Sequence, residues 1–328
     1  MQKETFSESI LAPILAAGKE LGYPTADPNG SGQTRSFSPV PVSISKGKRI
    51  GTYGSFAEKF AGKNLHVVTH AQVSRVLFKD NKAIGVELER FGKKEQIYTN
   101  QEVILSAGSI GTPQILMLSG VGDKDELAQH NIPLVLHSPE VGKNLQDHIF
   151  PHVPYKAPKA MSHDTLKLVQ PTALTDYLMQ GTGPLTSIGG VVGTGFIHTA
   201  VNNDTRPDIQ LIFASLTWAV DFGTNLRKIC GLGDEAFDWY KEQPESEFGV
   251  MIAPVLSRPK SKGSIKLRSS DPMDHPIIEA NYLRDKFDLD TLASSLEFLH
   301  DLIETKAFKE AGIELFDPFP PCAHNKFR

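Results

Sequence analysis

The sequence predicts an α/β domain followed by an α+β domain, with the boundary near residue 150. The first observation is the apolar run Val103–Leu105, which leads into Gly108 and is typical of a buried strand that turns into a helix. The second is a strand-rich second half that ends in a long amphipathic pattern over 287–308. The third is a group of three prolines within 151–158, where the composition changes.

The first predicted domain, residues 1–150, opens with a helix whose apolar residues recur at helical spacing and which stops at Gly22. An edge-like strand follows, because Pro39 and Pro41 interrupt its alternation. A meander of short strands comes next, with a turn at residues 80–82. The expected elements are helices over 5–22 and 52–60 and strands over 36–45, 65–68, 71–78, 83–90 and 96–99.

The run from Val103 to Gly122 carries the most information. Gly108 and Gly111 permit sharp turning and close approach, since neither has a Cβ. Thr112 suits a helix N-cap and Pro113 the first helical position, where a missing N–H costs little. Taken alone, a strand, a glycine turn and a helix form a common connection that needs no ligand.

Beyond this run, Asp123 and the acidic residues after it predict the start of a short helix that stops at Asn131. The stretch from Val141 to His148 is polar and begins with glycine, so we expect a loop.

The second predicted domain, residues 151–328, contains strand-like runs and one long helix. A basic turn over 258–263 leads into a hairpin strand, and a further turn follows. The expected elements are strands over 208–213, 248–256 and 264–267, a turn over 271–276 and a helix over about 287–308.

The full spacing from Gly108 to Gly122 resembles the second signature of the glucose–methanol–choline (GMC) flavoprotein oxidoreductases. The matching residues are Gly108, Ser109, Thr112, Pro113, Ile115, Leu116 and Ser119-Gly120-Val121-Gly122. The stretch Gly142–His148 resembles the family's G-x-N-L-Q-D-H block, and Arg258–Ile265 resembles its R-P-x-S-x-G-x-I hairpin. The resemblance extends from about Phe6 to the end of the chain.

This resemblance implies a partial FAD-binding domain joined to a substrate domain built on an antiparallel sheet. It implies an FAD-dependent oxidoreductase that acts on CH–OH donors, similar to the glucose-dehydrogenase and choline-dehydrogenase branches. A hydride would pass from a small-molecule alcohol or sugar to flavin, which supplies the redox chemistry. The electron acceptor, oxygen or a quinone-like carrier, is not specified.

The resemblance also places the cofactor-binding residues. The backbone of Val73 would contact the adenine of FAD, and Ala107, Gly108 and Ser109 would let the chain approach the adenosine half. The alternatives are a buried strand valine and close packing of helix on sheet without a ligand. Likewise, the side chains of Asn144, Gln146, Asp147 and His148 would either shape the cofactor and substrate chamber or stabilise a turn.

Two features expected of the family were not found. The sequence contains no G-x-G-x-x-G loop for the pyrophosphate, and the glycine cluster 189–193 is better explained as a packed or mobile loop. No catalytic residue is assigned, since His324 and Asn325 are adjacent whereas the family's pair is separated. We therefore expect an internal fragment that lacks both segments.

The alternative is a truncated or degenerate member that is not an enzyme and cannot hold FAD. An NAD-dependent Rossmann dehydrogenase is disfavoured, because the phosphate loop and its acidic partner are missing.

Bulk properties exclude several other classes of protein. The net charge of −4 and the absence of basic clusters argue against nucleic acid, and no apolar run is long enough for a membrane span. Cys230, Cys322 and the scattered histidines predict no metal site. The triplets Asn29-Gly30-Ser31 and Asn203-Asp204-Thr205 could accept glycans, which leaves the compartment undecided with a slight preference for secretion.

Overall fold

The computed structural model describes residues 8–30, 35–201 and 204–320. Several residues named in the sequence analysis lie outside these ranges: Phe6, Ser31, Asn203, Cys322, His324 and Asn325.

The chain forms two compact units, and each combines separate stretches of sequence. Unit 1 combines 1–56, 148–258 and 287–328, and unit 2 combines 57–147 and 259–286. The predicted boundary near 150 is close to the change of unit after residue 147. The units nevertheless differ from the two predicted consecutive domains, because 1–56 joins the second half and 259–286 joins the first.

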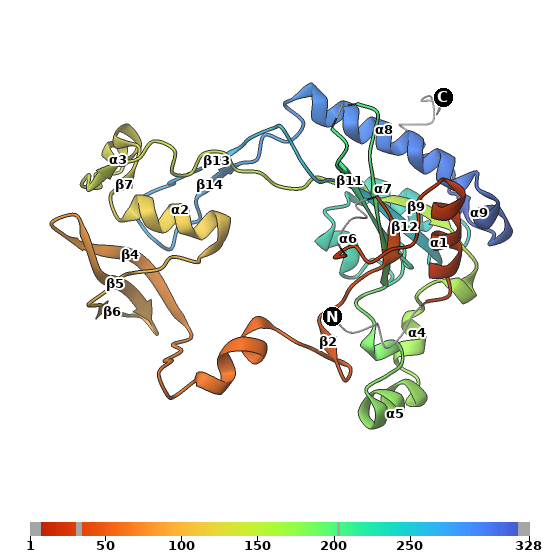
Figure 1. Cartoon of the computed structure of the whole chain (residues 1–328), viewed down its shortest axis with the longest axis horizontal. Coiled ribbons are helices and arrows are strands. Elements are labelled where there is room, and N and C mark those ends of the chain that lie inside the picture. The colour runs from red at the N-terminus through yellow and green to blue at the C-terminus, as the bar shows by residue number, and fades with distance from the viewer. Residues whose placement is uncertain (1–7, 31–34, 202–203, 321–328) are drawn as a thin grey trace. The chain divides into compact units, whose positions relative to one another are not determined.

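Unit 1 is an antiparallel sheet with helices packed on it (Figure 1). Its strands are β1 (Phe37–Pro39), β2 (Ile44–Ser45), β3 (Lys48–Arg49), β9 (Val153–Lys156), β10 (Val191–Ile197), β11 (Ile209–Ala214), β12 (Gly249–Leu256) and β15 (Glu314–Leu315). Its α-helices are α1 (Leu11–Glu20), α4 (Thr165–Leu168), α5 (Pro171–Gln180), α6 (Leu226–Ile229), α7 (Asp234–Lys241), α8 (Lys286–Ile303) and α9 (Lys306–Glu310). Short η turns cover Tyr53–Ala57, Lys159–Met161 and Pro184–Thr186.

The main sheet has six strands in the order β1-β10-β11-β12-β9-β15, and every pair is antiparallel. The central strand β12 is buried at all eight positions, as expected for a continuous apolar run covered on both faces. Its register pairs Ile252 with Phe213 on β11 and with Val153 on β9. As its prolines predict, β1 lies at one edge of this sheet.

Aromatic packing joins α1 and α8 to this sheet. The ring of Tyr23, just beyond α1, lies 5.6 Å from Phe37 on β1 and 5.5 Å from Phe298 on α8. Gly18 is required on α1, because a Cβ there would lie 2.6 Å from the ring of Phe37. The core of unit 1 therefore includes the N-terminal helix.

Two predicted features of unit 1 differ in the structure. The expected helix over 287–308 is divided into α8 and α9, because Thr305 starts a new helix by accepting from the N–H of Phe308. The glycine cluster 189–193 is not simply a loop, since Val191 and the residues after it form β10 in the sheet. The expected strands over 208–213 and 248–256 are confirmed as β11 and β12.

Unit 2 consists of small sheets around one longer helix. Its strands are β4 (Ala71–Lys79), β5 (Lys82–Arg90), β6 (Lys93–Tyr98), β7 (Val121–Gly122), β8 (Leu136–His137), β13 (Ser264–Lys266) and β14 (Ile277–Glu279). Its helices are α2 (Gly108–Leu118), α3 (Lys124–Gln129) and a 3-10 turn over Glu58–Phe60. The predicted meander is confirmed as β4-β5-β6, with Asp80 and Asn81 at positive φ in its first turn.

The core of unit 2 lies between α2, α3 and the β13–β14 hairpin. It is formed by Met117, Leu127, Ile265 and Leu267. The hydroxyl of Ser119 joins α2 to β4, because it accepts from the N–H of Val76 at 2.8 Å. The predicted cap at Asp123 is confirmed, since its carboxylate accepts from the N–H groups of Asp125 and Glu126.

Two predicted strands of the first half are wrong. Val103–Leu105 and Leu65–Val68 form no strand, and Ile104 is 77% exposed. No neighbouring strand pairs with either segment within the described residues, and a strand needs such a partner for its N–H and C=O groups.

The predicted start of the helix at Thr112 is also wrong. The helix α2 begins at Gly108, whose φ of +80° lets the chain turn there. Pro113 consequently lies inside the helix rather than at its first position.

Candidate functional site

The N-terminus of α2 has no side-chain cap. Ala107 occupies the N-cap position and offers no acceptor, although its own N–H donates to the hydroxyl of Thr112 at 3.1 Å. The first N–H groups of a helix have no partner within it, and they carry a partial positive charge. Ser109, in this first turn, is exposed. This end of α2 therefore suits an anionic or hydrogen-bonding ligand.

The predicted polar loop is anchored to the β13–β14 hairpin. The N–H of Ile265 donates to the carbonyl of Gly142, and Leu145 and Gly263 exchange two backbone hydrogen bonds of 3.0 and 2.8 Å. Gly142 has φ +81°, and a Cβ there would lie 2.2 Å from the carbonyl oxygen of Ile265. The family-like hairpin thus fixes the backbone of the family-like loop.

The α2 N-terminus and this loop line one cavity of about 280 Å³. Ser109 contributes from the helix, and Asn144 and Gln146 contribute from the loop. The amide of Gln146 donates to the amide oxygen of Asn144 at 3.4 Å. The remaining lining residues are Pro113, Gly142, Lys143, Leu145 and Ile265.

This cavity, which we call the α2 cavity, offers polar side chains that can donate and accept hydrogen bonds. Lys143 supplies a positive charge, and the lining contains no aspartate or glutamate. Hydroxyl and amide groups of the kind carried by Ser109, Asn144 and Gln146 bind sugar hydroxyls and phosphate oxygens. The donor set therefore fits part of a dinucleotide cofactor such as FAD.

The other predicted residues lie around this cavity or away from it. Ala107 and Gly108 directly precede Ser109 and are exposed, but they do not line the cavity. Val73 lies on β4, and its neighbours Gln72 and Ser74 line a different cavity, of 320 Å³. Successive strand side chains point to opposite faces, so the side chain of Val73 is directed away from that second cavity.

Asp147 and His148 do not line the α2 cavity. The carboxylate of Asp147 accepts a hydrogen bond from the hydroxyl of Tyr282, and this bond raises the pKa of the Tyr282 phenol. Within unit 2 the Asp147 side chain therefore holds the stretch after β14, which agrees with the turn-stabilising alternative. His148 belongs to unit 1.

Lys143 is the residue of this site that the sequence analysis did not single out. It lies between Gly142 and Asn144, which both have positive φ, so the loop turns sharply on either side of it. A lysine flanked by two turn residues in the polar block was the available signal.

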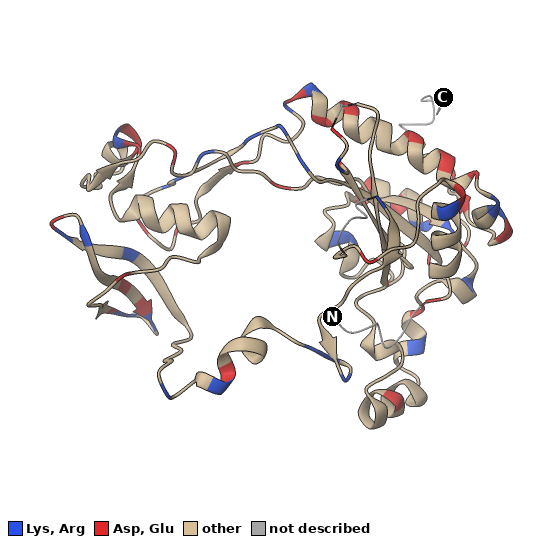
Figure 2. Cartoon of the chain, viewed as in Figure 1, with Lys and Arg blue, Asp and Glu red and all other residues tan. Residues whose placement is uncertain are grey.

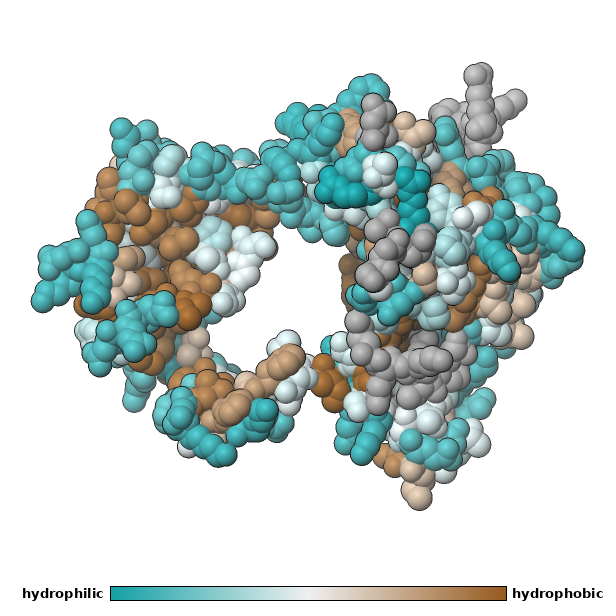
Figure 3. Space-filling view, in the orientation of Figure 1, coloured by the Kyte–Doolittle hydropathy of each residue, from teal (hydrophilic) through white to brown (hydrophobic). Residues whose placement is uncertain are grey.

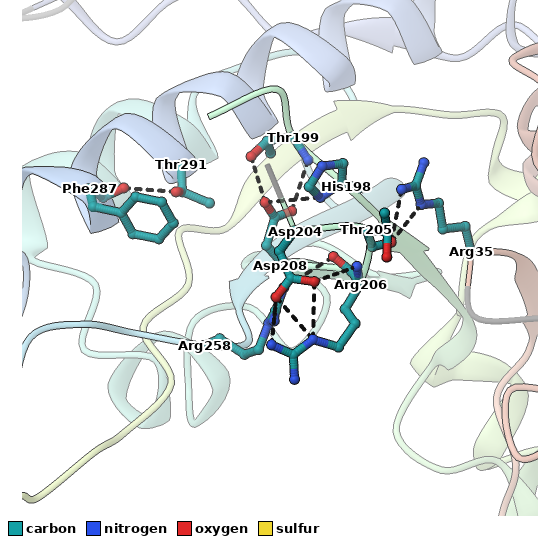
Figure 4. Close-up of polar contacts among 10 residues, drawn as sticks. All are labelled: Arg35, His198, Thr199, Asp204, Thr205, Arg206, Asp208, Arg258, Phe287 and Thr291. Carbon is teal, nitrogen blue, oxygen red and sulfur yellow. Dashed lines mark hydrogen bonds and ion pairs between the residues drawn. The ribbon is translucent and has the colours of Figure 1, made fainter. Parts of the chain in front are cut away.

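A separate polar cluster lies in unit 1, in the loop between β10 and β11 (Figure 4). The carboxylate of Asp204 accepts from Arg206 and from Arg258, the latter at 2.7 Å. These guanidinium groups, that of Arg206 first, hold the pKa of Asp204 well below its usual range. Arg35 donates to the carbonyl of Thr205 at 2.8 Å. The cluster ties Arg258, the first residue of the family-like hairpin motif, to the sheet of unit 1.

Two searches of the described residues bear on other kinds of site. No group of three or more His, Cys, Asp or Glu side chains there could hold a metal ion. In the same part of the chain, no helix is long and apolar enough to cross a membrane.

Comparison with known proteins gives consistent matches. Two family models, both described as GMC oxidoreductase, match residues 3–150 and 259–326. A GMC-type oxidoreductase of Mycobacterium bovis is 35% identical over 89% of this chain and 51% of its own length. Glucose dehydrogenase [FAD, quinone] of Drosophila melanogaster is 32% identical over 95% of this chain and 48% of its own length. The chain thus spans about half the length of the curated relatives it matches.

The fold is also found among solved structures. A variant of formate oxidase from Aspergillus oryzae, studied for its FAD modification, superposes with a TM-score of 0.79 at 25% identity. The match covers 98% of this chain and 58% of that one.

Proposed function

This chain belongs to the GMC oxidoreductase family, and from that premise we propose that it forms part of an FAD-dependent oxidoreductase acting on a CH–OH donor. The family consists of enzymes, and matched proteins carry FAD in their names. FAD, when bound, supplies the acceptor for a hydride from the donor. The α2 cavity is the observation that carries the proposal, since it joins Ser109 to Asn144 and Gln146.

The chain's own residues would hold the cofactor in the following way. The free N–H groups of the first turn of α2 and the ammonium group of Lys143 would bind an anionic group. Ser109, Asn144 and Gln146 would donate hydrogen bonds to oxygens of the cofactor. The backbone of Val73, on β4, would contact the adenine, and the exposed turn at Ala107 and Gly108 leaves room for the adenosine half.

The proposed donor is a small alcohol or sugar of the kind that glucose-dehydrogenase-like and choline-dehydrogenase-like proteins oxidise. Following the family pattern, we assign the cofactor to residues 57–147 of unit 2 and the donor to the six-stranded sheet of unit 1.

Titration of the full chain with FAD tests the proposal. We expect saturable quenching of flavin fluorescence and an affinity roughly tenfold lower in Ser109→Asp, because that substitution places a negative charge at the helix N-terminus. Asn100→Asp is the matched control, since Asn100 is exposed in the same unit and lines neither the α2 cavity nor the cavity beside Val73.

Either of two results would contradict the proposal. One is no saturable binding by the wild-type chain, which would favour the alternative of a family member that does not hold FAD. The other is equal binding by Ser109→Asp and Asn100→Asp, which would move the cofactor away from α2.

A further inference from the structure

The helix α5 of unit 1 exposes its apolar side chains. Ala173 is 2% exposed and marks the face that packs on the protein. The opposite half carries Leu174 and Leu178, one helical turn apart, and Met179, which is 79% exposed. An amphipathic helix would normally bury such residues, so this face has no partner within the described part of unit 1.

The neighbouring helix α4 extends this surface. Leu166 on α4 is 57% exposed, and Val169, in the two-residue link to α5, is 79% exposed. We define the α4–α5 patch as Leu166, Val169, Leu174, Leu178 and Met179. Figure 3 shows hydrophobic atoms at the surface in the region of α5. Exposed apolar residues that gather in this way, rather than singly, mark a site of interaction with a partner or a membrane.

A basic hairpin lies beside this patch. The turn between β2 and β3 touches the end of α5, because a Cβ on Gly47 would lie 2.9 Å from the carbonyl oxygen of Gly181. Lys46, Lys48 and Arg49 on this hairpin are all exposed, and Figure 2 shows the positive charge there. The stretch 40–57 contains no aspartate or glutamate.

Two acidic residues belong to α4 and α5, Asp164 and Asp176, and both are half-buried. Asp164 caps α4 by accepting from the N–H of Leu166. Asp176 lies against Gly183, with its Cβ 3.2 Å from the position of a Cβ there, and on α5 it is one turn before Met179. The surface is therefore apolar in one part and positively charged in the adjoining part.

A recess of about 450 Å³ lies at the base of the same hairpin. Its lining is mixed, since it includes the apolar Ile44 and Ile50 and the polar Ser43 and Ser187. Arg49 also lines it, so the positive charge of the hairpin extends to this recess.

From these observations we propose that the α4–α5 patch and the β2–β3 hairpin dock unit 1 on a membrane surface that contains anionic lipids. Apolar side chains enter the head-group boundary, and basic side chains meet the negative surface charge. Docking at the interface needs no spanning helix.

Co-sedimentation of the full chain with lipid vesicles tests the proposal. We expect binding to vesicles of phosphatidylcholine with phosphatidylserine, weak binding to phosphatidylcholine alone, and loss of binding at high salt. The double substitution Leu174→Glu/Leu178→Glu should lower the partition coefficient by tenfold or more, roughly, because it removes the inserting face. Lys48→Gln/Arg49→Gln should lower it by about thirtyfold on the anionic vesicles and leave binding to phosphatidylcholine unchanged.

The matched control is Ile229→Glu, because Ile229 on α6 is 80% exposed and lies outside the patch. It should bind as the wild-type chain does, and circular dichroism melts should show all variants folded. The proposal is overturned if the wild-type chain does not bind anionic vesicles, or if Ile229→Glu loses as much binding as Leu174→Glu/Leu178→Glu. Light scattering that shows a dimer which Leu174→Glu/Leu178→Glu dissociates would assign the patch to a second copy instead.

Discussion

Two apolar stretches, β12 in unit 1 and Val103–Leu105 in unit 2, have similar composition and different structures. The strand β12 lies between β11 and β9 and is buried throughout, whereas Val103–Leu105 forms no strand and leaves Ile104 77% exposed. A run of apolar residues becomes a strand only where neighbouring strands satisfy its backbone. Unit 1 supplies such neighbours in one continuous sheet, and unit 2 consists of small sheets around α2.

Replacing one isoleucine in each of these two stretches should give the largest difference in stability. Ile252→Ala, on β12, removes a side chain that is 0% exposed, so we expect a loss of about 2–5 kcal/mol in the free energy of unfolding. Ile104→Ala removes a similar group from the surface and should change that free energy by about 0.5 kcal/mol or less. Urea unfolding of both variants measures the difference. Equal destabilisation would show that Ile104 is buried in solution.

The same contrast explains which parts of the fold could be predicted. The meander β4-β5-β6 was predicted because Asp80 and Asn81 tolerate the positive φ that its first turn needs. A local sequence pattern does not show whether a neighbouring strand pairs with 103–105. It also does not show that residues 1–56 pack with the second half. Long-range contacts of this kind produce no periodic pattern of residues in the sequence.

The candidate site was predicted in part for a similar reason. The motif resemblance selected Ser109 and the block around Asn144, and the structure brings them to one cavity. Lys143 was missed, because only the anchored turn at Gly142 shows that the loop faces α2. The start of α2 was predicted at Thr112, since Thr112 and Pro113 are good starting residues, but the left-handed Gly108 begins the helix earlier.

A second pair of variants sharpens the comparison at the anchored loop of unit 2. Gly142→Ala combines a positive φ with a Cβ placed 2.2 Å from the carbonyl oxygen of Ile265. Gly92→Ala has a similar φ of +74° and no atom within 4 Å of its Cβ, so it isolates the cost of the backbone conformation. We expect Gly142→Ala to destabilise unit 2 by roughly 1–3 kcal/mol more than Gly92→Ala does.

Amide hydrogen exchange gives the local measurement for this pair. The N–H of Ile265 donates to the carbonyl of Gly142, so its protection should fall in Gly142→Ala and stay near the wild-type level in Gly92→Ala. Unchanged protection in Gly142→Ala would mean that the loop absorbs the extra atom, and the anchor would then not position Asn144.

The smallest expected effect concerns the loop of unit 1 that holds Asp204. The lining of the α2 cavity contains no such carboxylate. Because Arg206 and Arg258 keep the pKa of Asp204 below its usual range, the folded state favours the carboxylate. Its contribution to stability is therefore fully present above the unfolded pKa of about 4 and declines as the pH falls below that value. Asp204→Asn should remove this contribution and reduce the decline in stability between about pH 5 and pH 3. The effect should be small, since ion pairs at the surface are screened by solvent.

Urea midpoints of the wild-type chain and Asp204→Asn, measured across this range, should converge at low pH. Midpoints that stay parallel would show that the guanidinium groups do not stabilise the Asp204 carboxylate in solution, and that Arg258 is held by its other bond, to the carbonyl of Arg206.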